Sequence, residues 1–367
     1  MFYEKYRLIN DTFIVDAVVH PYDLAPGNQV ASAQAQLDSV YAAHRMSVDQ
    51  VHASYLLAHD EFFSDFSFEA LARAEFVESP VDLAVIHALP NLGFAKGYVT
   101  APDRAAAFRN RHPDRFKLYA TVDTPVLGDA IAQLERQVGE LGVDGLKLYP
   151  AFFYDGLGKG WRLDGDAFAT PLLERAQRLG IKHIAIHKAL WLPPAPREAF
   201  GIDDMANPLS RFPELDFQIV HAGTAFLDQT LTLLERHDNL YLTLETMFAY
   251  ILVKPRLFAK ILGGFIKRCG SERLLFASGN NLMHPLPLLN AFANYQFPAD
   301  AMAEFGLVQL SDTDRRNILG LNALRMYGLD PHEVSTRTAG DEFARARSAA
   351  IPPPWSQLRG DRPADPA

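Results

Sequence analysis

Three histidines and one glutamate stand at the ends of short apolar runs in this sequence. His20 follows one run, His187 and His221 end two more, and Glu245 follows a fourth. Neutral imidazole and carboxylate are natural ligands of zinc, iron or manganese. The four side chains therefore predict a divalent metal site, provided that the fold brings the ends of these runs together.

A lysine and one of these histidines are the candidate catalytic groups. His221 is predicted to act as a general base or to stabilise an oxyanion. Lys147 lies within another apolar run, in the segment 145–150, and is predicted as a second catalytic residue. Without a metal ion, these two side chains would have to carry acid–base chemistry by themselves.

The segment after Lys147 is rich in aromatic residues. Positions 152 to 154 are all aromatic, and Trp161 stands next to Arg162. Aromatic walls with one cation suit a flat or apolar acid, although such a loop can equally pack on its own side chains. Two asparagines follow the last apolar run of the series. The predicted substrate-binding residues are Trp161, Arg162, Asn280 and Asn281.

Eight apolar runs alternate with segments of helical periodicity, which is typical of repeated βα units. Eight runs fit a closed parallel barrel, whose strands are covered on both faces, better than an open sheet. No glycine-rich phosphate-binding motif follows the first run, which weakens the dinucleotide-binding alternative. The predicted strands are residues 13–19, 83–87, 117–122, 145–149, 184–187, 217–221, 240–244 and 274–278.

These elements predict a (β/α)₈ TIM barrel with a helical insertion after strand one. The carboxyl ends of all strands meet at one mouth of such a barrel, so the candidate residues would share one cavity. Residues 21–80 contain no strand of their own and would form the insertion near that mouth. Five histidines fall on predicted helices or loops and are expected at the surface: His44, His52, His112, His237 and His332.

Composition changes near residue 330. Residues 1–330 are predicted to form one barrel domain, because α/β barrels of this size are often single domains. Residues 331–367 are rich in Ala, Arg, Ser and Pro, which predicts a poorly structured C-terminal arm. Trp355 would pack on the partner subunit of a homodimer, unless the arm is a solvated tail.

Charge and composition exclude several kinds of partner. The net charge of −9 argues against nucleic acids and anionic membranes, because phosphate binding needs clustered Lys and Arg. Cys269 is the single cysteine, so no intrachain disulfide can form. Residues 1–11 contain no apolar signal core, and no apolar run approaches the roughly 18–20 residues of a bilayer-spanning helix. We expect a cytoplasmic protein with a small-molecule substrate.

The order of these motifs resembles the amidohydrolase superfamily, in the branch of aminocarboxymuconate-semialdehyde decarboxylase and the resorcylate-type decarboxylases. Members open with Asp-x-His-x-His on strand one. They carry a histidine after strands five and six and an aspartate after strand eight. This sequence has Asp16 to His20, then His187, His221 and the segment 276–281 in the same order. Residues 316–329 are similar to the last helix of the family, so the resemblance covers roughly residues 10–330.

Two metal-binding positions of that family differ here. Val18 stands where the resemblance places a histidine, and Gly279 stands where it places the aspartate. Because side chains alternate along a strand, residues 16, 18 and 20 are predicted to share its inward face. Val18 would then point into the barrel without offering a ligand atom.

The resemblance implies a metal-dependent hydrolase of a small carbonyl-containing or carboxylated substrate, with a non-oxidative decarboxylase as the alternative. A rearranged metal site would use the four ligands named above, with an oxygen from Asn280 or Asn281. Two other hypotheses remain: a pocket that has lost its metal and performs acid–base chemistry, and a metal-free binding relative. Some members of the wider superfamily use a strand-four lysine to bridge two metals, but Lys147 is predicted as a pocket residue.

Overall fold

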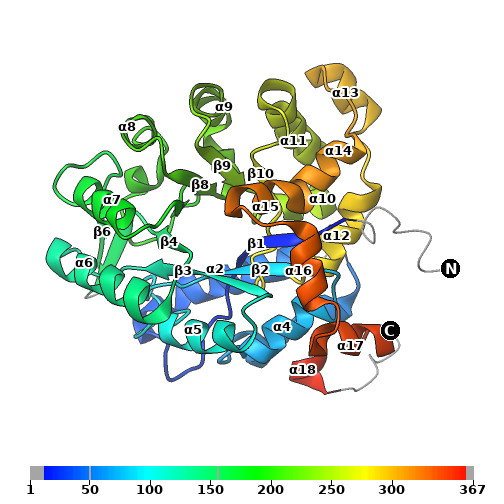
Figure 1. Cartoon of the computed structure of the whole chain (residues 1–367), viewed down its shortest axis with the longest axis horizontal. Helices are drawn as coiled ribbons and strands as arrows, with labels where there is room; N and C mark the ends of the chain where they lie inside the picture. Colours follow the sequence, from blue (N-terminus) through cyan, green and yellow to red (C-terminus); the bar gives the residue numbers. More distant parts are fainter. Residues whose placement is uncertain (1–11, 49–50, 155–156, 361–367) are drawn as a thin grey trace.

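Eight parallel strands form the centre of the computed structural model, which describes residues 12–48, 51–154 and 157–360. Neighbouring strands follow the order β1-β2-β3-β4-β7-β8-β9-β10 around the ring that is visible in Figure 1. The strands are β1 (Val15–Val19), β2 (Leu83–His87), β3 (Phe116–Thr121), β4 (Gly145–Leu148), β7 (His183–His187), β8 (Asp216–Val220), β9 (Leu240–Thr243) and β10 (Leu274–Leu275). A separate hairpin pairs β5 (Ala151–Tyr154) with β6 (Leu157–Gly160).

The ring is closed by the chain that continues from β10 alongside β1. The amide of Ala17 donates to the carbonyl of Phe276 at 2.9 Å, and the amide of Gly279 donates to the carbonyl of Val18 at 3.0 Å. Farther toward the mouth, the amide of Asn281 donates to the carbonyl of His20 at 3.1 Å. The predicted TIM barrel is therefore confirmed, and the largest difference is in the last strand, where β10 covers only Leu274–Leu275 of the predicted residues 274–278.

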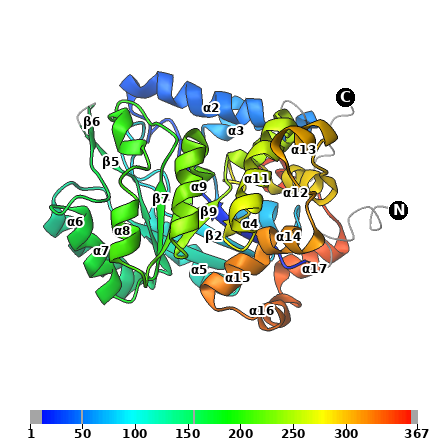
Figure 2. The ribbon, with the colours of Figure 1, turned by 90° about the horizontal axis from the view of Figure 1, so that it is seen from above.

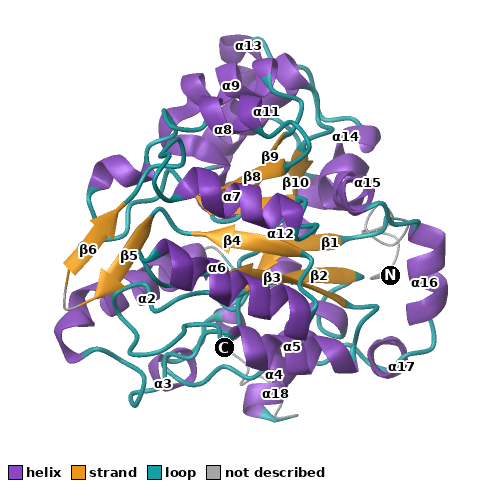
Figure 3. Ribbon diagram, turned by 60° about the vertical axis from the view of Figure 1, so that its left-hand side comes forward, coloured by secondary structure: helices purple, strands orange, loops and turns teal. Residues whose placement is uncertain are grey.

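Helices surround the strands and fill the connections between them (Figures 1 and 3). The first group is α2 (Gln34–Val48), α3 (His59–Phe62), α4 (Phe68–Phe76), α5 (Pro102–Arg111), α6 (Leu127–Arg136), α7 (Ala169–Arg178), α8 (Ala206–Arg211) and α9 (Leu227–Arg236). The second group is α10 (Tyr250–Val253), α11 (Pro255–Cys269), α12 (Pro285–Asn294), α13 (Ala299–Phe305), α14 (Asp312–Arg316) and α15 (Asn322–Tyr327). In the described part of the chain, no helix has both the length and the apolar character that a membrane span requires.

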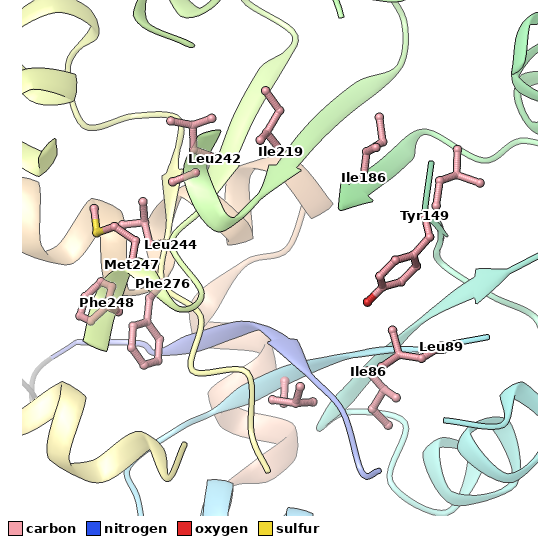
Figure 4. Close-up of a cluster of buried hydrophobic side chains, with 14 of the residues drawn as sticks. Ile86, Leu89, Tyr149, Ile186, Ile219, Leu242, Leu244, Met247, Phe248 and Phe276 are labelled. Atoms are coloured by element: carbon pink, nitrogen blue, oxygen red, sulfur yellow. The ribbon is translucent and has the colours of Figure 1, made fainter. Parts of the chain in front are cut away.

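A continuous apolar layer separates the strands from the surrounding helices. Ile86, Ile186, Ile219 and Leu242 point outward from four strands into this layer, and all four are fully buried (Figure 4). Alternate residues of the same strands point into the barrel. Because both faces are covered, each strand is apolar almost throughout, which explains why the sequence shows runs and not alternation.

A bulge in β1 interrupts the predicted alternation of inward and outward side chains along this strand. Asp16 pairs with Ala84, and the register then shifts so that Val19 pairs with Ile86. The outward face of β1 therefore carries Asp16 and Val19, whereas Val18 belongs to the inner apolar cluster. The prediction that residues 16, 18 and 20 share one face was wrong for Asp16, because the extra residue reverses the side on which it points.

Helix α2 covers one end of the barrel, and helices α15 and α16 lie at the opposite end (Figure 2). His44 fixes this cover in place. Its Nδ1 donates to the carbonyl of Leu282 at 2.8 Å, and its Nε2 accepts from the amide of Leu57 at 2.9 Å. The prediction of His44 as a surface residue was therefore wrong, because its side chain lies on the buried face of α2 and is fully buried.

The C-terminal arm is helical and packs on its own chain. Its helices are α16 (Pro331–Thr338), α17 (Glu342–Ala349) and α18 (Ser356–Arg359), and α18 lies beside α4. The indole of Trp355 is only 1% exposed and donates to the carbonyl of Tyr55 at 2.8 Å. The expectation of a poorly structured arm was wrong for residues 331–360. Trp355 packs within its own chain and not on a partner subunit. The arm beyond residue 360 and the predicted lack of a signal core in residues 1–11 lie outside the described residues.

Candidate active site

The four predicted metal ligands line one cavity of about 530 Å³ at the mouth of the barrel. His20 follows β1, His187 ends β7, His221 follows β8 and Glu245 comes two residues after β9. The strand ends therefore gather these side chains, as barrel geometry requires. The upper walls are apolar and include Val40 of α2 together with Leu92, Phe94, Trp191, Leu192 and Leu282.

Two imidazoles contact each other directly on the cavity floor. Nε2 of His221 lies 3.1 Å from Nδ1 of His187, and Nε2 of His187 lies 2.7 Å from the carbonyl oxygen of Leu190. A carbonyl only accepts, so Nε2 of His187 carries a hydrogen. Nδ1 of His221 lies 3.1 Å from the hydroxyl oxygen of Thr246. We call this chain of hydrogen bonds, from Thr246 through His221 and His187 to Leu190, the imidazole relay.

Burial keeps both relay histidines neutral near pH 7. Desolvation lowers the pKa of His221 to about 4 and lowers the pKa of His187 well below its usual range. In the neutral state each ring has one hydrogen and one lone pair. Nε2 of His221 then donates to Nδ1 of His187, and the hydroxyl of Thr246 donates to Nδ1 of His221.

His20 and Glu245 face each other beside the relay. Nδ1 of His20 donates to the carbonyl of His87 at 3.2 Å, which directs Nε2 toward Oε1 of Glu245 at 3.7 Å. Burial would raise the pKa of Glu245, but nearby His221, His20 and Lys147 outweigh it and lower the pKa to about 2. Glu245 is therefore an ionised acceptor, and within the described part of the chain its Oε2 has no hydrogen-bond partner.

Lys147 places an ammonium group inside the barrel. Its side chain is fully buried, and Nζ has no hydrogen-bond acceptor among the described residues. The amine lies 5.1 Å from the ring centre of Tyr149, which lines the cavity. Burial lowers the pKa of Lys147 to about 8, although the Glu245 carboxylate opposes this effect. Buried polar atoms without partners are rare and often mark functional sites.

The backbone around the relay is strained. His221, Ala222, Thr246 and Ala189 all have φ values between +54° and +69°, although none of them is glycine. Such conformations cost about 1–3 kcal/mol each and cluster at functional sites. The strain follows from the geometry, because the chain must turn sharply at the ends of β7, β8 and β9 to direct these side chains into the cavity.

The predicted substrate-binding residues have different positions. Asn281 is fully buried, and neither end of its side-chain amide has a partner in residues 12–48, 51–154 and 157–360. Asn280 donates to Glu75 at 2.6 Å. Arg162 is 46% exposed and pairs with two aspartates, and Trp161 packs on neighbouring aromatic rings. Neither Trp161 nor Arg162 lines the cavity of about 530 Å³, so a substrate contact from these two stays a prediction.

Sequence inspection missed several residues of this site. Tyr22 and Tyr149 line the cavity, and Thr246 ends the relay. His87 is fully buried below His20 and stacks on Tyr119. The signal for His87 was present, because it ends a predicted strand as His20 and His187 do.

The observed donors do not form a metal-binding set. Within residues 12–48, 51–154 and 157–360, no three His, Cys, Asp or Glu side chains are placed to hold an ion together. The relay hydrogen bonds use the nitrogen atoms of His187 and His221, which leaves Nε2 of His20 and the carboxylate of Glu245. The prediction that all four residues ligate one ion remains a prediction, and it requires the relay to break.

Comparison with known proteins identifies the family. The sequence profile described as Amidohydrolase matches residues 33–329, which is well over half of the chain. The chain belongs to the amidohydrolase family. No curated protein sequence matches it.

Solved structures of this amidohydrolase's fold are distant in sequence. An uncharacterised TIM-barrel protein from Bordetella bronchiseptica is 18% identical, with a TM-score of 0.61 over 86% of this chain and 98% of that one. A dihydroxybenzoic acid decarboxylase from Polaromonas, bound to manganese and the inhibitor 2-nitroresorcinol, is 16% identical (TM-score 0.52, 86% and 96% covered). A probable 2-pyrone-4,6-dicarboxylic acid hydrolase from Acinetobacter baumannii, with citric acid bound, is 13% identical (TM-score 0.52, 86% and 99% covered). At these identities the similarity establishes the fold.

Proposed function

We propose that this amidohydrolase is a non-oxidative decarboxylase of a small carboxylated aromatic compound. The observation that carries the proposal is the cavity itself, which the ionised carboxylate of Glu245 lines beneath apolar walls. The buried ammonium of Lys147 lies next to Tyr149, another lining residue. Hydrolysis was the leading expectation from the sequence. Decarboxylation is preferred here because decarboxylases of carboxylated phenols recur among the structural relatives.

The shape and chemistry of the cavity suit a flat acid. Its volume of about 530 Å³ lies within the range of about 300–1,000 Å³ that is usual for small-molecule sites. Phe94 and Trp191 offer aromatic faces, and Leu192 and Leu282 complete an apolar wall. Polar substrate groups would point to the floor, where Glu245 has a carboxylate oxygen without a partner among the described residues. Lys147 is buried beside the lining residue Tyr149 and does not itself line the cavity.

Glu245 on the cavity floor and Lys147, buried beside Tyr149, can supply both halves of the required proton transfer. Glu245, with its pKa lowered to about 2, accepts a hydrogen bond from a phenolic hydroxyl and increases electron density in the ring. Lys147, with a pKa of about 8, donates a proton to the ring carbon that bears the carboxylate. The bond to the carboxylate carbon then breaks, its electron pair stays in the ring, and carbon dioxide leaves. The free amine regains a proton from water.

His221 remains the other predicted catalytic residue. Its Nε2 hydrogen points to His187 in the imidazole relay, so it does not face the ring of a bound substrate directly. In this mechanism the relay holds two neutral imidazoles in fixed positions next to Glu245. A protonated histidine at this place would compete with the substrate for the carboxylate.

A divalent ion remains a prediction from the resemblance, and manganese is bound in the decarboxylase from Polaromonas. Among the residues that the structure describes, no three His, Cys, Asp or Glu side chains form a set that could hold such an ion. No step of the mechanism is therefore assigned to a metal ion. Homodimer formation and a cytoplasmic location also stay predictions.

Hydrolysis is the second candidate, and one observation favours it. Oε2 of Glu245 is unpartnered and ionised, so it could remove a proton from a water molecule that attacks a lactone or amide. The probable 2-pyrone-4,6-dicarboxylic acid hydrolase shares the fold. Lys147 would then stabilise the oxyanion that forms on the carbonyl oxygen.

The test is to incubate purified protein with 2,6-dihydroxybenzoate and related hydroxybenzoates and to measure carbon dioxide and the phenolic product by chromatography. Glu245→Gln should lower the rate at least about 100-fold, a typical contribution of an acid–base group. Glu198→Gln, which changes an exposed carboxylate outside the cavity, is the matched control and should keep the wild-type rate. Turnover of lactones or amides, with no release of carbon dioxide from any carboxylated phenol, would replace this proposal with hydrolysis.

A further inference from the structure

The imidazole relay removes two predicted ligands from any metal site. Nε2 of His221 donates its hydrogen to Nδ1 of His187 at 3.1 Å. Nε2 of His187 is bound to the carbonyl of Leu190 at 2.7 Å. Both Nε2 atoms therefore carry a hydrogen, and the lone pairs of the two Nδ1 atoms accept hydrogen bonds, that of His187 from His221 and that of His221 from Thr246.

The space of the missing aspartate is already filled. A Cβ atom at Gly279 would lie 2.7 Å from Oε1 of Glu245, so an aspartate side chain and Glu245 could not both occupy this place. Glu245 thus keeps one carboxylate where the resemblance puts the aspartate after strand eight. Val18 supplies no second ligand on β1, because its inward side chain is apolar and fully buried.

The negative charge of Glu245 already interacts with a positively charged side chain. Lys147 lies close enough to interact electrostatically with Glu245, and both side chains are almost completely buried. The ammonium of Lys147, buried beside the lining residue Tyr149, therefore offsets the charge of the carboxylate on the cavity floor. A divalent ion beside Glu245 would add two positive charges next to a buried cation, and repulsion in this poorly solvated space would oppose its binding.

From these observations we propose that the cavity works without a resident metal ion and that the ammonium of Lys147 takes the place of the metal. Its three hydrogens have no acceptor among the described residues, so they are free to bind an oxygen or to protonate a carbon of the substrate. The ammonium of Lys147 would supply the positive charge of the site in either a decarboxylase or a hydrolase.

The first experiment measures metal directly. Tag-free protein is produced in medium supplemented with manganese and zinc, and its metal content is determined by plasma mass spectrometry. We expect less than about 0.1 ion per chain, because a structural or catalytic site would retain its ion through purification. About one ion per chain that disappears in both His20→Ala and His187→Ala would overturn the inference. An ion that both variants retain lies elsewhere on the chain and leaves the inference standing.

The second experiment tests Lys147 without any need for the substrate. Manganese is titrated into wild type and Lys147→Met by calorimetry, with melting curves to confirm folding. Removing the ammonium should raise the manganese affinity at least about tenfold, comparable with changes beside known metal sites. Lys159→Met, which changes an exposed lysine on β6, should bind as wild type does. Equal affinities of wild type and Lys147→Met would show that Lys147 does not stand in for an ion.

Discussion

Replacing Lys147 by methionine should stabilise the protein while it removes activity. The lysine is fully buried and has no hydrogen-bond acceptor among the described residues, and the cost of burying its charge outweighs the attraction of Glu245. Burial lowers the pKa from 10.5 to about 8. At about 1.4 kcal/mol per pH unit, this lowering corresponds to a penalty of about 3 kcal/mol in the free energy of unfolding. Methionine has a similar length and no charge, so most of that penalty should disappear.

The stability difference between Lys147→Met and wild type should depend on pH. Because the folded-state pKa is lower than the unfolded-state value, the penalty is fully present below about pH 8. It decreases as the pH rises toward 10.5, where the amine is neutral in both states. Urea unfolding at pH 7 should show Lys147→Met more stable than wild type by about 2–3 kcal/mol. The difference should shrink toward zero near pH 10.5.

Lys188 provides a matched control for this prediction. It is also fully buried, but its Nζ donates to Asp204 at 2.7 Å and to the carbonyl of Ala199 at 2.9 Å. Lys188→Met leaves a buried carboxylate unpaired and should cost about 3–5 kcal/mol. If Lys147→Met were destabilised as much as Lys188→Met, Lys147 would have partners that the structure does not show, and the reasoning would fail.

Three further changes test other parts of the structure. His187→Ala should lower turnover at least about 100-fold and change the melting temperature by less than about 4 °C, measured by steady-state kinetics and calorimetry; full turnover would remove His187 from the site. Trp355→Ala should cost about 3–5 kcal/mol in urea unfolding and speed protease cleavage near Tyr55, whereas unchanged cleavage would show that the arm does not hold the cover. Gly279→Ala puts a Cβ 2.7 Å from Oε1 of Glu245 at a φ of +70°, so stability should fall by about 1–2 kcal/mol together with turnover; wild-type kinetics would mean that Glu245 can move without consequence.

The positions of the main site residues could be predicted because they depend on strand ends. His20, His187, His221 and Glu245 each follow an apolar run, and a closed barrel brings the carboxyl ends of its strands together. How the side chains pair is a different matter. The contact between His187 and His221 depends on sharp turns after the strands, where non-glycine residues adopt positive φ values that the sequence does not announce.

Other features depend on contacts between distant segments. The bulge in β1 left no trace in composition, because Ala17, Val18 and Val19 are all apolar and any alternation is compatible with them. His44 looked like a polar residue on a surface helix, but its environment is set by Leu282, 238 positions later in the chain. The burial of Trp355 could not be predicted for the same reason, since the carbonyl of Tyr55 that it contacts lies 300 positions earlier.

The hydrogen bonds between the C-terminal arm and the residues that follow α2 have a consequence for the order of folding during synthesis. Arg359 donates to the carbonyl of Ser54, which precedes it by 305 positions. A ribosome that adds about 5–20 residues per second needs about 15–60 s to synthesise that stretch. During this time Ser54 and its neighbours lack the side chain that anchors them. We expect the barrel strands to assemble before the cover is fixed, so that a nascent chain acquires a sheltered cavity only after Arg359 has left the ribosome.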